Sequence, residues 1–199
     1  RTVEINSSTT NGPTLSNGHF FGTSVANIGD LNNDGVNDLA VGTTGNDDGG
    51  EDKGAIHIMF MNTDGSVDST VKINDSTANG PVLNNGDYWG RSVANIGDLN
   101  NDGVNDIVVG ALKDDGSGTQ HGAVYIMHMN TDGSIDSTVE INDSTTNGPT
   151  LNDDDYFGSS IANIGDLDGN GVDDIAVGAR IDDNGGNARG AIHILFLDK

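Results

Sequence analysis

The chain of 199 residues is strongly acidic, with 31 Asp and Glu residues against 8 Lys and Arg, and its net charge is −23. This charge repels nucleic acid and anionic lipid, so we expect neither as a partner. The sequence has no cysteine, which excludes a disulfide framework and thiol chemistry. No apolar run approaches the about 18 residues of a membrane span, so we expect no membrane insertion.

The first third of the chain contains four short segments with the apolar pattern of β-strands: 21–28, 39–42, 55–61 and 70–73. The third segment, AIHIMFM, carries apolar residues on both faces, as a strand between two packed layers does. The fourth alternates Val71 and Ile73 with Thr70 and Lys72, as a half-exposed outer strand does. No helical periodicity competes with these segments, so we expect an all-β fold.

Between the first two of these segments, the stretch GDLNNDGVND places oxygen-bearing side chains on alternate residues of a short loop. Calcium takes six to eight oxygen ligands at about 2.3–2.6 Å in a tolerant geometry. Loop positions one, three, five and nine would supply side-chain oxygens, position seven a backbone oxygen, and Gly35 at position six permits the sharp turn. The candidate ligands in this loop are Asp30, Asn32, Asp34, Val36 and Asp38.

The same loop recurs twice, each time displaced by 68 residues. The second set of candidate ligands is Asp98, Asn100, Asp102, Val104 and Asp106, and the third is Asp166, Asp168, Asn170, Val172 and Asp174. Each loop keeps three carboxylates and one amide, although the amide moves from position three to position five in the third. We therefore predict three calcium ions per chain.

Two other interpretations of these loops are weaker. An EF-hand loop would end in a bidentate Glu at position twelve, before a helix. Here that position is Val41, Val109 or Val177, inside a strand-like run, which disfavours an EF-hand or a dockerin-type pair. An Asx-rich turn that binds nothing remains the alternative, and three matches in register weigh against it.

The 68-residue period covers the whole chain without insertion or deletion, so we treat residues 1–199 as one repeat domain with units 3–70, 71–138 and 139–199. Four antiparallel strands per unit, apolar on both faces of the middle strands, predict a wedge that packs between neighbouring wedges. Such a wedge is the blade of a β-propeller.

The units resemble the FG-GAP repeat of integrin α-subunit propellers. The resemblance lies in the aromatic-glycine pairs at Phe21, Trp89 and Phe157, in the calcium loops, and in the GAP-like pairs at Gly42, Gly110 and Gly178, where no Pro follows. It implies four-stranded blades with calcium loops on the lower face. It also implies ligand contact on the opposite face, through residues 6–19, 74–87 and 142–155 together with 43–53, 111–121 and 179–189.

This resemblance suggests an extracellular module for recognition or adhesion in which calcium is mainly structural. Open loops of this kind bind calcium with dissociation constants of roughly 0.1–1 mM, which suits an extracellular medium, and the near-identical units suggest a bacterial surface protein. No catalytic constellation is visible, so we expect no enzyme. Two alternatives stay open: a lectin-like module that stacks sugars on Phe20, Tyr88 and Tyr156, or the non-catalytic part of a secreted polysaccharide- or lipid-degrading enzyme. We expect Trp89 in the core.

Three blades are too few for a closed propeller, which has about four to eight. Residues 2–5 repeat the sequence of the fourth strand, which the last unit lacks. We therefore expect a homodimer that forms a six-bladed ring, in which residues 2–5 of one chain complete the last blade of the other. A piece of a longer array, flanked by neighbouring repeats, and a compact three-bladed monomer are the alternatives. A protein or glycan ligand is possible in each case.

Overall fold

In the computed structural model, which describes residues 1–198, every ordered element is a β-strand. The strands form three antiparallel sheets, and in each of them consecutive strands are neighbours. Sheet 1 consists of β1 (Phe21–Gly29), β2 (Asp38–Thr43), β3 (Ala55–Met61) and β4 (Val67–Ile73). Sheet 2 consists of β5 (Trp89–Gly97), β6 (Asp106–Ala111), β7 (Ala123–Met129) and β8 (Ile135–Ile141). Sheet 3 has three strands, β9 (Phe157–Gly165), β10 (Asp174–Ala179) and β11 (Ala191–Leu195).

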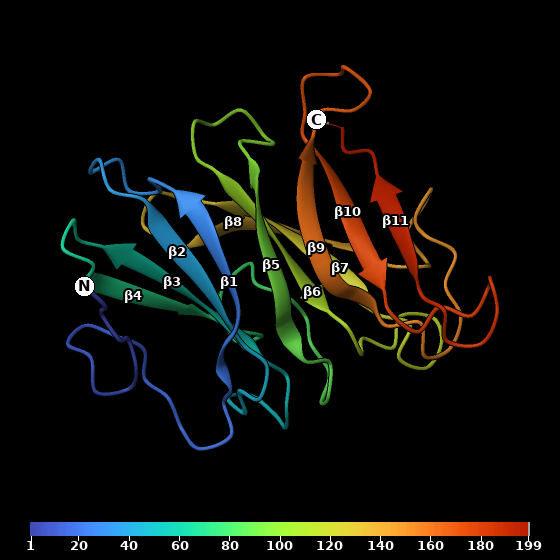
Figure 1. Cartoon of the computed structure of the whole chain (residues 1–199), viewed down its shortest axis with the longest axis horizontal. Coiled ribbons are helices and arrows are strands. Elements are labelled where there is room, and N and C mark those ends of the chain that lie inside the picture. Colours follow the sequence, from blue (N-terminus) through green and yellow to red (C-terminus); the bar gives the residue numbers. More distant parts are fainter. Residues whose placement is uncertain (199) are drawn as a thin grey trace.

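The all-β fold is confirmed, and sheets 1 and 2 have the four antiparallel strands expected of a unit, whereas sheet 3 has three. The third predicted strand coincides with β3, and the outer strand β4 begins at Val67, three residues earlier than its apolar alternation indicated. Figure 1 shows the three sheets side by side with sheet 2 in the middle, and β5 lies against both β1 and β9. The structure thus contains three neighbouring sheets of the kind expected for propeller blades, and ring closure stays a prediction.

Two apolar layers hold the sheets together. Between sheets 1 and 2, Ile56 and Ile58 of β3 pack in one cluster with Trp89, Tyr125 and Met127. Trp89 is fully buried there, as predicted. In a second cluster, the face of sheet 2 that points away from sheet 1 packs against sheet 3. In sheet 2 the middle strands need apolar residues on both faces, because one face packs against sheet 1 and the other against sheet 3.

The sheets approach so closely that their inner strands require glycine. A Cβ atom at Gly42 would lie 2.0 Å from the carbonyl oxygen of Gly90, and one at Gly110 would lie 2.1 Å from that of Gly158. These glycines belong to the GAP-like and aromatic-glycine pairs of successive units. Both glycines recur in every repeat of this chain because the glycine of one repeat contacts the backbone of the next repeat.

Among residues 1–198, no helix is long and apolar enough to cross a membrane.

Candidate metal sites

The three candidate calcium loops connect β1 to β2, β5 to β6, and β9 to β10, and each is folded around its first aspartate. In the first loop, Asp30 accepts the N–H groups of Asp34 and Gly35 at 2.9 and 2.8 Å. Asp98 and Asp166 accept the equivalent pairs in the other two loops, at 2.9–3.2 Å. Backbone donors thus hold the carboxylate at position one inside the turn.

Two positions in each loop adopt a left-handed backbone. Gly35, Gly103 and Gly171 at position six have φ of 90°, 91° and 87°, as the predicted sharp turn requires. Position four is also left-handed, with Asn33, Asn101 and Gly169 at φ of 61°, 60° and 80°. Asparagine and glycine tolerate this conformation best. This second left-handed position was not predicted from the sequence, although the Asn or Gly at position four is the signal that could have indicated it.

The aspartate at position nine has a structural role that the sequence did not reveal. Asp38 is completely buried, and its two oxygens accept the N–H groups of Leu31 and Met61, each at 3.0 Å. Asp106 and Asp174 make the equivalent pairs of bonds. Burial raises the pKa of Asp38, and the N–H bonds from Met61 and Leu31 oppose the rise. Position nine therefore ties the loop to the far end of the third strand in its sheet.

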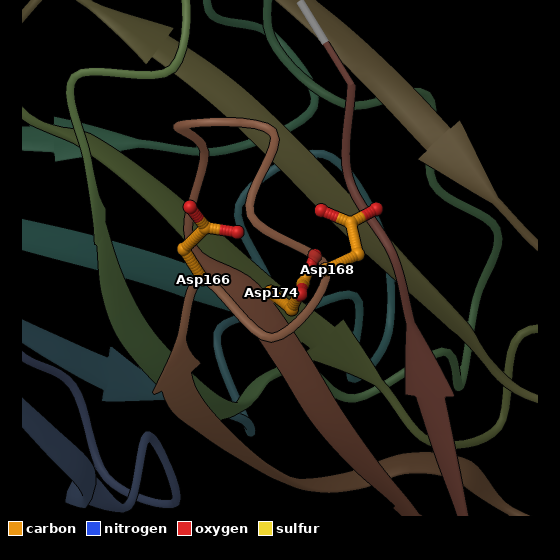
Figure 2. Close-up of side chains that lie close together, drawn as sticks. All are labelled: Asp166, Asp168 and Asp174. Carbon is orange, nitrogen blue, oxygen red and sulfur yellow. The ribbon is translucent and has the colours of Figure 1, made fainter.

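The third loop brings its acidic side chains closest together. Asp166, Asp168 and Asp174 offer carboxylate oxygens that all lie within 4.8 Å of one another, the one such acidic or histidine group among residues 1–198. Figure 2 shows Asp166 and Asp168 on either side of Asp174. The N–H group of Gly171 lowers the pKa of Asp166, which favours its charged form.

The first two loops have an amide in place of the carboxylate at position three. Asn32 accepts the N–H of Asp34 and also donates its side-chain amide to the Asp34 carboxylate at 2.9 Å. Asn100 does the same with Asp102. Each carboxylate oxygen that accepts one N–H retains a second lone pair. A set composed only of oxygen donors, with three carboxylates per loop, suits a hard divalent cation such as calcium.

At the opposite end of the sheets, the loops of neighbouring units are joined by polar contacts. Lys53 forms an ion pair with Asp75 at 2.6 Å. His121, at the position equivalent to Lys53, lies between Asp143 and Asp153, at 2.8 and 3.0 Å. Burial alone would lower the pKa of His121, but the hydrogen bonds that its ring makes to these two carboxylates outweigh burial, and the pKa is raised.

The three aromatic residues considered as sugar-stacking groups have different surroundings. The ring of Tyr88 lies under the ammonium of Lys113 at 4.9 Å, and that of Tyr156 lies under the guanidinium of Arg180 at 4.7 Å. One face of each tyrosine ring is therefore covered by a cation. Phe20, the equivalent residue of the first unit, is 68% exposed.

Comparison with known proteins identifies the family. The family model of the FG-GAP repeat matches residues 21–59, 89–127 and 157–195, together more than half of the chain. The chain therefore belongs to the FG-GAP repeat family, as its motifs suggested.

The similar proteins are integrin α subunits. Integrin alpha-4 of Xenopus laevis is 32% identical over 167 residues, which cover 84% of this chain and 15% of that protein. Integrin alpha-6 of Gallus gallus is 36% identical over 163 residues, covering 81% and 14%. Integrin alpha pat-2 of Caenorhabditis elegans is 32% identical over 180 residues, covering 81% and 13%. The chain thus spans about a seventh of their length. These relatives come from animals and give no support to the bacterial source that we expected.

Proposed function

We propose that the chain is a calcium-binding, integrin-like module that acts in extracellular recognition or adhesion and not in catalysis. The observation that carries the proposal is the convergence of carboxylate oxygens of Asp166, Asp168 and Asp174 within 4.8 Å, in a loop whose pattern recurs in each of the three FG-GAP repeats of this chain. The likeness to integrin α subunits over most of the chain supports a role in adhesion at the cell surface.

Calcium in these loops would act mainly on stability. Three carboxylates in one short loop repel one another, and a cation bound only by the folded loop shifts the equilibrium toward the folded chain. At about ten times the dissociation constant, one ion adds roughly 1.4 kcal/mol to the free energy of unfolding. Three ions would add about 4 kcal/mol, a large share of the 5–15 kcal/mol that is typical for a domain.

Isothermal titration calorimetry with calcium chloride tests the site assignment, and thermal unfolding in calcium and in EDTA tests the effect on stability. We expect three ions per chain and a melting temperature that falls in EDTA. Asp168→Asn should remove the third ion or weaken its binding at least tenfold. Asp136→Asn is the matched control because it removes one exposed charge from β8, outside the loops. Equal calcium binding by both variants would contradict the assignment.

The recognition role is tested separately, on the loops opposite the calcium sites. The chain would be immobilised, and adhesion of cells and binding to a glycan array would be measured in calcium and in EDTA. Calcium-dependent binding of either kind supports a recognition module, and the array separates the lectin-like alternative from protein recognition. Cleavage of a polysaccharide or ester substrate by the purified chain would contradict the proposal.

A further inference from the structure

The two junctions between neighbouring sheets are built from the same contacts. The Ser24 hydroxyl donates to the carbonyl of Gly90 at 2.8 Å, and 68 residues later Ser92 donates to Gly158 at the same distance. At the first junction the backbone N–H of Trp89 donates to the carbonyl of Lys53 at 3.0 Å. At the second junction the backbone N–H of Phe157 donates to the carbonyl of His121 at 2.9 Å. We call the face that a sheet turns toward the next sheet along the chain its rear face, and the face that it turns toward the preceding sheet its front face. The rear face of one sheet and the front face of the next are therefore the two halves of one repeated interface.

Sheet 3 presents the rear half of this interface to solvent. Ile56 and Phe60 of sheet 1 are 0% and 5% exposed, because sheet 2 covers them. Their equivalents in β11 and just after it, Ile192 and Phe196, are 74% and 56% exposed. Ser160, which occupies the position of Ser24 and Ser92, is also exposed. A Cβ atom at Gly178 would meet only serine side chains, whereas one at Gly42 or Gly110 would strike the backbone of the next sheet.

Sheet 1 presents the matching front half. Its outer face holds a small apolar cluster that includes Val41, Met59 and Met61. In sheet 2, the equivalent residues Val109, Met127 and Met129 are packed against sheet 1. Val25, which pairs with Val41, is 59% exposed. Val41, Met59 and Met61 are themselves 4%, 1% and 8% exposed, with Ile5 and Phe21 packed against them. Sheets 3 and 1 therefore carry the residues that form the two complementary halves of each internal junction.

The free edge of β11 offers space for one more strand. A groove of about 730 Å³ follows this edge and is lined by Ile194, Phe196 and Asn147, among others. In sheets 1 and 2 the equivalent edge is covered by β4 and β8. The hydroxyls of Thr70 and Thr138, in these outer strands, donate to the carbonyls of Asn11 and Asn79 at 2.8 and 2.7 Å. Asn147 occupies the same position of the third unit and faces the groove.

Residues 2–5 have the sequence of such an outer strand and already lie where one is needed. Their sequence TVEI is identical to that of 138–141 and differs from 70–73 at one residue. Val71 of β4 approaches the Cβ position of Gly133 in the next sheet to 3.3 Å, and Val3 approaches that of Gly65 to 3.5 Å. Residues 2–5 form no strand and Ile5 packs on sheet 1. Residues 2–5 therefore contact sheet 1 in the way that β4 contacts sheet 2, but they are not paired with any strand of a sheet.

We propose that two copies of this chain bind each other through these faces, so that sheet 3 of each packs on sheet 1 of the other. Residues 2–5 of one copy then pair with β11 of its partner. The register follows from the complete sheets, where Ile58 pairs with Val71 and Ile126 with Val139. Val3 of one copy therefore lies opposite Ile194 of the other.

The number of sheets that a closed ring can contain favours a dimer over larger assemblies. Head-to-tail interfaces form rings when the rotation closes and filaments when it does not. Each copy contributes three sheets, and propellers contain about four to eight. Among multiples of three, only six falls in that range, so two copies complete a ring with two identical junctions.

The mass in solution tests the assembly. Sedimentation velocity of the full chain at micromolar concentration should give twice the 20.5 kDa of one chain. Ile192→Asp should give the single-chain mass, because it places a charge in the new junction. Val82→Asp is the control, since Val82 is 83% exposed in the loop before β5 and its carbonyl accepts the Tyr125 hydroxyl of sheet 2, the middle sheet. Both residues are exposed in the single chain, so both variants should keep the β-sheet circular dichroism of the unmodified chain.

Cross-linking tests the register, and the absence of cysteine from the sequence removes any background. A chain with Val3→Cys and Ile194→Cys, treated with a short bismaleimide reagent, should run at the mass of two chains on a denaturing gel. The pair Val3→Cys and Val82→Cys should not. A single-chain mass for the unmodified protein, a dimer that persists in Ile192→Asp, or equal cross-linking of both pairs would overturn the proposal. So would a mass that grows beyond two chains with concentration, because it indicates a filament. Calcium titration of the Ile192→Asp monomer tests the metal sites independently of assembly.

Discussion

The buried aspartate at position nine gives the sharpest test of how the loops are held. Asp38→Asn keeps the size of the side chain but replaces one carboxylate oxygen with an amide donor. The two oxygens of Asp38 accept the N–H groups of Leu31 and Met61, both in buried residues. After the substitution one of these N–H groups faces another donor. An unpaired buried donor costs about 1–3 kcal/mol of unfolding free energy, even without calcium.

Asp30→Asn is the matched comparison in the same loop. Asp30 also accepts two backbone N–H groups, but these bonds are exposed and water can replace them. In EDTA we expect a change of at most about 0.5 kcal/mol, as for most surface substitutions. With calcium present, both variants lack a carboxylate ligand and should lose most of the stabilisation that one ion provides. The two substitutions thus differ in EDTA and converge in their response to calcium.

Urea unfolding followed by the fluorescence of Trp89 measures these differences, because this single tryptophan is fully buried between sheets 1 and 2. In thermal unfolding followed by the same fluorescence, Asp38→Asn should lower the melting temperature in EDTA by about 2–12 °C, at about 2–4 °C per kcal/mol for a chain of this size. Protein concentration is kept fixed, since assembly also contributes to stability. Wild-type stability of Asp38→Asn in EDTA, or an equal loss in Asp30→Asn, would refute the reasoning.

Two further predictions concern burial and close packing. Burial, with a smaller contribution from the charges of Lys72 and His19, lowers the pKa of His57 to about 4, so the free energy of unfolding should fall as the pH drops from about 6.5 to 4. His57→Phe should remove this loss and stabilise the chain by about 2 kcal/mol more at pH 5 than at pH 8 in urea titrations, and identical pH profiles would contradict it. Gly110→Ala should cost about 3 kcal/mol or more, because its Cβ would strike the carbonyl oxygen of Gly158, whereas Gly185→Ala, which meets nothing within 4 Å, should change the midpoint of urea unfolding little. Equal urea midpoints for the two glycine variants would contradict the prediction, because they would mean that sheets 2 and 3 can move apart to admit a methyl group without loss of unfolding free energy.

Local features of the chain were readable because they depend on neighbours in sequence. The alternation of residues 55–61 predicted β3 with its correct bounds, and the loop spacing predicted the turn at Gly35. The position-nine contact was not readable, since Asp38 bonds to Met61, which lies 23 residues further along the chain. The cations over Tyr88 and Tyr156 come from loops 24–25 residues away and were missed for the same reason.

The sequence by itself determined the repeat, its strands and its oxygen-rich loops, because strand alternation and turn chemistry act over a few residues. Only the tertiary structure decided which copies of the repeat are covered. Ile56 and Ile192 stand in nearly the same local sequence, AIHIMF and AIHILF, yet one is 0% and the other 74% exposed. The physical reason is that burial on a sheet face depends on what packs against it. Sheet 2 packs against Ile56, and no described residue of the same chain covers Ile192 in that way.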